Sequence, residues 1–171
     1  MSYRTRTYIA ADWTEDKDAV DQLHKWNEKE YWRLYFLDAH DITKSRDTSL
    51  NCSIKTSLKK RLDRSKTFVL IVGNNTKKLR SGSCQHCENY SSYNKSCNKG
   101  NPVDYRSYIQ YECYIAEKYI QNIIVLYKST KVNKSLCPEN LQNVGNHVPM
   151  WYNKDGKKYW DYQSVKEALS Q

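Results

Sequence analysis

Short apolar runs alternate along the chain with segments in which apolar residues recur every three or four positions. Four runs read as strands, at residues 8–11, 32–37, 67–72 and 123–127. The run at 67–72 (T-F-V-L-I-V) is continuously apolar, which is typical of a strand buried on both faces of a parallel sheet. A shorter apolar stretch at 148–151 predicts a last strand.

Helical spacing occupies the segments between these runs. A first helix should begin at Thr14 as its N-cap and bury a face made of Ala19, Val20, Leu23 and Trp26 or Asn27. A second helix carries Ile54, Leu58 and Leu62. A third spans 105–120 and a final one 162–169. This alternation of strands and helices predicts an α/β fold with a central parallel sheet covered by helices on both faces.

Polar segments interrupt this order in two places. Residues 39–48 lack any periodic pattern and are expected to form a loop after the second strand. Residues 76–104 are polar for longer than a structureless loop usually is, which indicates an insertion. With a C-terminal extension at about 130–171 and no linker or repeat, residues 1–171 are expected to form one domain.

The predicted strand ends indicate where a ligand should bind. Open parallel sheets bind ligands at the carboxyl ends of their strands, where helix N-termini also favour anions. In this chain those ends carry Ala11, Asp12, Trp13, Asp38 and Asn74. The sequence contains neither a G-x-G-x-x-G after the first strand nor a P-loop, which argues against conventional dinucleotide and P-loop sites.

One acid interrupts the apolar stripe of the third helix. Helical spacing places Glu112 on the inward face and turns Glu117 away. The remaining members of that face are Tyr105, Tyr108, Ile109, Ile115 or Ala116, and Tyr119. A buried carboxylate costs several kcal/mol unless it is paired. Glu112 is therefore either an ion-pair partner, with Arg106 as the candidate, or a carboxylate held in a cleft for chemistry, and the nearby strand ends favour the second interpretation.

Several of these segments carry a resemblance to a known family. The strands Y-I-A-A-D, F-L-D and S-K-T-F-V-L-I-V-G, and the helix Y-I-Q-Y-E-C before I-I-V-L-Y, resemble the Toll/interleukin-1 receptor (TIR) domain family over about residues 8–127. Within it the chain looks most like the bacterial TIR proteins of the Thoeris anti-phage defence system. The resemblance implies a flavodoxin-like fold of three layers.

The resemblance also implies roles for particular residues. In the family an aromatic residue stands four positions before a Glu, as Tyr108 stands before Glu112 here. Enzymatic TIR domains cleave NAD with that Glu, so Glu112 is the expected catalytic residue and Tyr108 is expected to stack on the substrate. Asp38, at the base of the family's loop at 39–48, or Asn74 would position it. After the first strand, Ala11, Asp12 and Trp13 replace the family's usual aromatic and basic residues as expected substrate contacts.

The function implied by the resemblance is NAD cleavage, by a glycohydrolase, cyclase or transferase reaction that releases nicotinamide. NAD would be a substrate, and no cofactor is expected. The product would be an ADP-ribose-derived signal, made after a phage-derived trigger and read by a separate effector protein, with self-assembly into a homo-oligomer on activation. The alternative is a non-enzymatic TIR-like scaffold that acts by self-association or partner binding.

Six cysteines raise the question of a metal. Cys84 and Cys87 form a C-x-x-C with Cys97 beyond, but zinc needs four tetrahedral ligands, so free thiols in a loop are favoured over a zinc site. A Cys–His nucleophile pair using His86 or His24 is expected still less, because nothing places either histidine beside an activated thiol.

The net charge of +9 bears on partners and location. Lysines and arginines are scattered, with a dense cluster at 59–61 alone, whereas a nucleic-acid binder concentrates them on one face. Nucleic-acid binding is therefore not expected. No apolar run approaches the roughly 20 residues of a membrane span, and the first residues lack a signal-peptide core. We therefore expect a cytoplasmic protein without a membrane partner.

Overall fold

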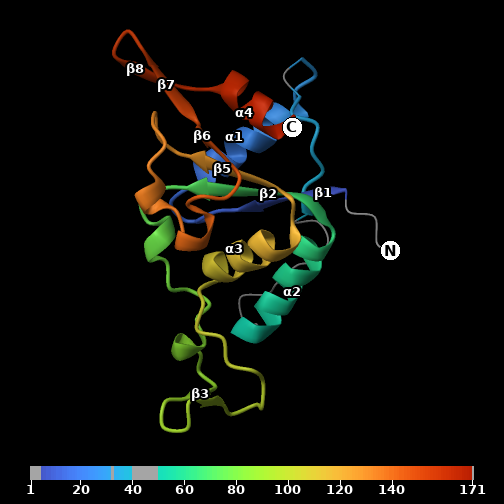
Figure 1. Cartoon of the computed structure of the whole chain (residues 1–171), viewed down its shortest axis with the longest axis vertical. Coiled ribbons are helices and arrows are strands. Elements are labelled where there is room, and N and C mark those ends of the chain that lie inside the picture. The colour runs from blue at the N-terminus through green and yellow to red at the C-terminus, as the bar shows by residue number, and fades with distance from the viewer. Residues whose placement is uncertain (1–4, 32, 40–49, 171) are drawn as a thin grey trace.

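A four-stranded parallel sheet forms the centre of the molecule (Figure 1). The computed structural model describes residues 5–31, 33–39 and 50–170. The sheet has the order β1-β2-β5-β6. Its strands are β1 (Arg6–Ala10), β2 (Ser65–Val72), β5 (Asn122–Tyr127) and β6 (Asn146–Pro149). The helices are α1 (Lys17–Glu28), α2 (Asn51–Asp63), α3 (Tyr108–Tyr119) and α4 (Tyr162–Leu169).

Helices cover both faces of this sheet, as Figure 1 shows, with α1 and α4 on one face and α2 and α3 on the other. Along β2, Phe68, Leu70 and Val72 face α2 and α3, and Val69 and Ile71 face the opposite core. Alternate residues of a strand point to opposite faces, so a strand buried on both sides must be apolar throughout. The predicted three-layer α/β fold is confirmed.

The predicted strand at 32–37 is not a regular strand. Residues 33–37 run beside β1, where the Thr7 N–H donates to the Leu37 carbonyl at 2.8 Å and Thr7 bridges to Asp38. The Asn27 side chain bonds both the N–H and the carbonyl of Phe36, at 3.0 and 2.9 Å. These two bonds replace ladder bonds, and Tyr35 has a φ of +55°, so the extended pattern is broken. Trp32 lies outside the described residues. So does the loop predicted at 39–48, with the exception of Ala39.

Helices α1 and α3 begin later than the sequence predicted. Helix α1 starts at Lys17, not after Thr14, because the Asp12 carboxylate accepts the Thr14 N–H at 3.0 Å and holds a turn there. Its buried face is the predicted one. Helix α3 starts at Tyr108 behind a Ser107 N-cap, so Tyr105 precedes it. Tyr105 and Tyr119 are exposed, and the expectation that both are core residues is wrong.

The segments outside the sheet contain more structure than expected. Two short turns, η2 (Thr76–Lys78) and η3 (Cys84–His86), lead into a hairpin of β3 (Tyr90–Ser91) and β4 (Ser96–Cys97). Figure 1 shows this part projecting beyond α2 and α3. Near the C-terminus, turns η4 (Lys134–Leu136) and η5 (Glu139–Leu141) precede β6. A second hairpin pairs β7 (Trp151–Lys154) with β8 (Lys157–Trp160), and α4 has the predicted bounds.

Candidate functional site

Glu112 lies inside the molecule, on the face of α3 that packs on the sheet. Its side chain is 7% exposed, as its place on the apolar stripe predicted. The hydroxyl of Tyr8, from the middle of β1, donates a hydrogen bond to Glu112 Oε1. Tyr8 itself is fully buried. A strand and a helix 104 positions apart therefore fix the carboxyl group between them.

Burial governs the protonation of this pair. It raises the pKa of Glu112 to about 7, and the hydrogen bond from Tyr8 and the positive charge of Arg61 offset only part of that rise. The pKa of Tyr8 is raised well above its usual value, first by burial and then by the charge of Glu112. Near neutral pH the tyrosine therefore stays a proton donor, whereas Glu112 exists in both protonation states.

Arg106 is not the partner of Glu112, so the predicted candidate for an ion pair is wrong. Its guanidinium binds Asp104 at 2.9 Å, and its N–H binds the same carboxylate at 2.9 Å. Arg106 directly precedes the N-cap of α3, and Asp104, two positions earlier, holds its side chain there. The positive charge that acts on Glu112 is Arg61 of α2, which is buried.

Sequence reasoning missed both Tyr8 and Arg61. A signal for Arg61 was present, because it follows Leu58 by three positions and therefore shares the buried face of α2. Tyr8 lies in an apolar strand, and its polar tip indicated a need for a hydrogen-bond partner.

Asp38 lies near this pair and not at the carboxyl edge of the sheet, where it was predicted. It pairs with Thr7, three residues before β1 ends, because residues 33–38 run beside the amino-terminal half of that strand. Its negative charge acts on Tyr8. Its carboxylate is 3.3 Å from His24 Nε2, and this contact is the first cause of a raised pKa of that histidine.

The carboxyl ends of β1 and β2 hold the other predicted contacts. Ala11 and Asp12 are buried there, Trp13 is 46% exposed, and Asn74 is exposed just after β2. Tyr8 lies two residues, or about 7 Å, before the end of its strand, so this edge and Glu112 occupy different levels of the sheet. The topology therefore brings Ala11, Asp12, Trp13 and Asn74 to one edge without placing Glu112 among them.

The ion pairs of Lys128 at this edge were not predicted. Lys128, just after β5, binds Asp18 at 2.7 Å and Asp16 at 3.5 Å. Asp16 is buried, and burial raises the pKa of its carboxyl group. A Cβ on Gly73 would come within 2.2 Å of Asp16 Oδ1, so a side chain there would displace the Asp16 carboxylate. Both carboxylates stand before or within the first turn of α1, where the lysine offsets their charge.

Tyr108 is held in the first turn of α3, one turn before Glu112. Its hydroxyl donates to Asn51 Oδ1 at 2.9 Å. Its ring lies against Gly82, whose φ is +96° and whose Cβ, if present, would be 2.5 Å from the ring. Helix α2 and the chain before η3 therefore fix the tyrosine. Its stacking on a substrate stays a prediction.

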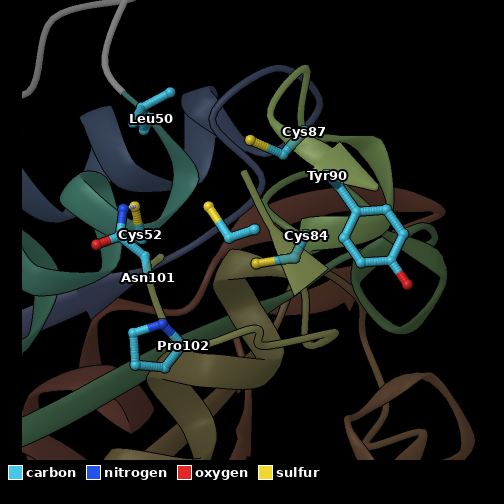
Figure 2. Close-up of a pocket in the computed structure, with 8 residues that line it drawn as sticks. Leu50, Cys52, Cys84, Cys87, Tyr90, Asn101 and Pro102 are labelled. Carbon is cyan, nitrogen blue, oxygen red and sulfur yellow. Dashed lines mark hydrogen bonds between the residues drawn. The ribbon is translucent and has the colours of Figure 1, made fainter. Parts of the chain in front are cut away.

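A pocket lies at the start of α2, beside the β3–β4 hairpin (Figure 2). Cys84, Cys87 and Cys97, the weak metal candidates of the sequence, all line it, together with Cys52 of α2. All four are free thiols. Within the part of the chain that the structure describes, no three Cys, His, Asp or Glu side chains are arranged as ligands of a metal ion. The described helices also include none that is both long and apolar enough to span a membrane.

The parallel sheet with helices on both faces is consistent with the flavodoxin-like fold of TIR domains. Residues 1–81 match the family model described as Thoeris protein ThsB, TIR-like domain. Over these residues, 81 of 171, the resemblance to the Thoeris TIR-like domain is confirmed. The match runs from β1 past β2 and includes Tyr8 and Arg61, whereas α3 lies outside it. A search of curated proteins found no match.

Proposed function

We propose that this protein cleaves NAD, with Glu112 as the catalytic carboxylate, and that the product is an ADP-ribose-derived signal in anti-phage defence. The matched family suggests the defence role. The observation that carries the proposed chemistry is the state of Glu112, an acid buried on the inward face of α3 with a pKa of about 7. Perturbed acids of this kind concentrate at functional sites.

The reaction makes one main demand on the protein. Nicotinamide is cationic in NAD and departs neutral, so positive charge develops on the ribosyl group and no general acid is needed. A carboxylate beside the ribose stabilises that charge, as carboxylates do in glycoside hydrolysis. Because Glu112 is removed from water, its interaction with the developing charge is stronger than that of an exposed carboxylate. Tyr8 fixes the orientation of the carboxylate through Oε1.

The acceptor decides which product forms. Water gives ADP-ribose, and attack by a group of the substrate gives a cyclic product. NAD is the substrate and no cofactor takes part. We assign stacking on the substrate to Tyr108 and its positioning to Asp38 and Asn74. At the carboxyl edge, Ala11, Asp12 and Trp13 are the proposed contacts for the rest of the dinucleotide.

The test compares two glutamates of one helix. Glu112→Gln keeps the shape of the side chain and removes its charge. Glu117→Gln is the control, because Glu117 lies on the exposed face of α3, where it binds Asn140 at 3.1 Å. Nicotinamide and nucleotide products are measured by mass spectrometry in infected and uninfected cells. We expect Glu112→Gln to reduce nicotinamide release by at least a hundredfold while Glu117→Gln keeps it, since electrostatic stabilisation of this kind contributes about 3 kcal/mol or more. Equal activity of both variants would contradict the assignment of Glu112.

One observation favours the alternative function, a TIR-like scaffold. The carboxyl group of Glu112 already accepts a hydrogen bond from Tyr8, and Glu112 does not line the pocket beside the β3–β4 hairpin. A scaffold would protect cells from phage without releasing nicotinamide, and Glu112→Gln would retain protection. Loss of both nicotinamide release and protection in Glu112→Gln, with unchanged solubility and self-association, supports the enzyme.

The remaining parts of the proposal concern the cell. We place the protein in the cytoplasm, where a phage-derived trigger promotes its assembly into a homo-oligomer and a separate effector protein reads the nucleotide signal. Because assembly is part of the activation, activity assays should include concentrated protein and extracts of infected cells.

A further inference from the structure

The segment at residues 84–101, which we name the cysteine lobe, has no hydrophobic core. After Cys84, none of its residues is buried, and Tyr93 is 94% exposed. Its hairpin consists of two strands of two residues each. Segments that bury so little apolar surface are usually held together by disulfides or by a structural metal ion. The fold of the lobe therefore requires a source of stability other than apolar burial.

Four cysteines line one pocket at the base of this lobe. Cys84 begins the η3 turn and Cys87 follows it, Cys97 ends β4, and Cys52 lies in the first turn of α2. All four line one pocket with Leu50, Tyr90, Asn101 and Pro102. In Figure 2 the sulfur atoms of Cys84 and Cys87 both point toward the side of the pocket where Cys52 and Asn101 lie. The sequence analysis grouped Cys84, Cys87 and Cys97, and the fold brings Cys52 to the same pocket.

The backbone turns tightly at each of the lobe's thiols. The Cys87 N–H donates to the Cys84 carbonyl at 3.0 Å, and the Gly100 N–H donates to the Cys97 carbonyl at 2.8 Å. Gly100 adopts a φ of +73°, which closes the second turn. A C-x-x-C turn and a second turn that presents one thiol are suited to hold sulfur ligands around a common centre.

Hydrogen-bond donors are directed at the sulfur atoms as well. The Asp104 N–H donates to Cys84 Sγ at 3.3 Å, and Asn101 Nδ2 donates to Cys52 Sγ at 3.3 Å. Donors of this kind orient metal-binding sulfur atoms. Lys55, whose Nζ binds the Asp104 carbonyl at 3.2 Å, supplies positive charge at the same end of α2.

We propose that Cys52, Cys84, Cys87 and Cys97 bind one structural Zn²⁺ ion that closes the lobe and fastens it to α2. Zinc prefers four ligands in a tetrahedron, and four thiolates form a closed structural site with no open position for catalysis. On binding, each thiol releases its proton to solvent, so the charge of ion and ligands sums to −2 (four thiolates at −1 and Zn²⁺ at +2). The four side chains do not stand as metal ligands in the described structure, so binding requires them to rotate toward the ion within the pocket that they already line.

The role of the ion is structural, and the ion takes no part in the chemistry of NAD cleavage. Asn51, next to Cys52, also donates to the Ser83 carbonyl at 3.2 Å and accepts from Tyr108. The metal site therefore reinforces a junction of α2, the lobe and the first turn of α3. Two disulfides would use the same four cysteines, and the experiment separates the two chemistries.

The first measurement is the zinc content of the purified full-length protein by elemental analysis. We expect nearly one zinc ion per chain in the wild type and at least a tenfold lower content in Cys52→Ser and in Cys84→Ser. Cys113→Ala and Cys137→Ala are the matched controls, because both cysteines are fully buried in the sheet core. These controls should retain the zinc of the wild type. A Cys52→Ser protein with full zinc content would overturn the four-ligand site.

A second measurement does not depend on the folding of any variant. Wild-type protein is stripped of metal, loaded with Co²⁺, and its visible absorption is recorded. A tetrahedral site of four thiolates gives intense thiolate-to-metal bands, and Zn²⁺ abolishes them. Alkylation of the denatured protein without reductant should then label all six cysteines. Wild-type protein that lacks zinc after incubation with it, or that shows four unlabelled cysteines in two disulfides, would overturn the proposal.

Discussion

The sheet core and the cysteine lobe are stabilised in different ways. In the core, β2 is apolar from Phe68 and β5 from Ile123, and residues such as Leu70 and Ile124 are completely buried. In the lobe, the strands have two residues each and their side chains remain partly in water. The core therefore depends on area removed from water, whereas the lobe depends on a few groups at its base.

Helix α2 serves both regions with different parts of its length. Leu58 and Leu62, in its second half, contribute to the core. Asn51 and Cys52, in its first turn, support the lobe. A substitution should therefore affect mainly the region that its half of the helix serves, and the following experiments test this separation.

The largest effect is expected for Leu70→Ala. Removing this buried side chain from β2 should lower the free energy of unfolding by about 3 kcal/mol, because transfer and cavity terms add. Urea denaturation followed by circular dichroism measures the loss. Tyr93→Ala, in the exposed tip of the lobe, is the control and should change stability by less than about 0.5 kcal/mol. Similar losses in the two variants would contradict the difference between the regions.

Glu112→Gln should change the pH dependence of stability. Folding raises the pKa of Glu112 from 4.5 to about 7, so between these values the folded protein holds a proton that the unfolded chain has lost. The free energy of unfolding of the wild type therefore falls as pH rises through this window, and levels off above about pH 7. Relative to the wild type, the variant should gain up to about 3 kcal/mol between about pH 4 and pH 8. Denaturation at both pH values measures the difference, and a constant difference would contradict the raised pKa.

Ser107→Ala tests the boundary between the two regions. Ser107 accepts the Gln110 N–H at 3.2 Å, and Gln110 Oε1 accepts the Ser107 N–H at 2.9 Å, which closes a capping box at the start of α3. Loss of the serine hydroxyl should cost about 1 kcal/mol of global stability. Ser164→Ala is not a suitable control because its hydroxyl binds Asp161 at 2.7 Å. The exposed Ser92→Ala is suitable and should leave the denaturation midpoint unchanged.

Metal removal should have the smallest effect on global stability and a clear local one. If the lobe depends on Zn²⁺, a chelator should speed amide exchange at Cys87, Tyr90 and Gly100 by at least tenfold. Amides of β2 and β5 should keep their protection, because apolar burial holds them. Hydrogen exchange with mass spectrometry resolves the two regions. Uniform loss of protection throughout the sheet would show that the lobe and the core unfold as one unit.

The sequence predicted best where one physical rule decides the structure. Strand β2 and helix α4 followed from continuous apolar character and from helical spacing, and the inward position of Glu112 followed from the same spacing. The hairpin of β7 and β8 was missed although Asp155-Gly156 is a strong turn signal. Both residues have positive φ, at +51° and +73°.

The candidate site was predictable only in part, because its partners come from distant segments. Arg106 is close to Glu112 in sequence, but Asp104 is closer to Arg106 and binds its guanidinium. Tyr8 is the partner of Glu112 from 104 positions away, and no local pattern encodes that contact. Asp38 lies away from its predicted position for a similar reason. The side chain of Asn27 binds the backbone of Phe36, in the segment that leads to Asp38.

The cysteine lobe begins and ends at nearly the same point. The Cys84 N–H donates to the Asp104 carbonyl at 3.0 Å, so a hydrogen bond joins the two segments of chain that enter and leave the lobe. A segment with adjoining ends can be shortened, lengthened or exchanged without changing the distance that its neighbours must span. We therefore expect that a change in the length of the lobe leaves the sheet and its flanking helices in place.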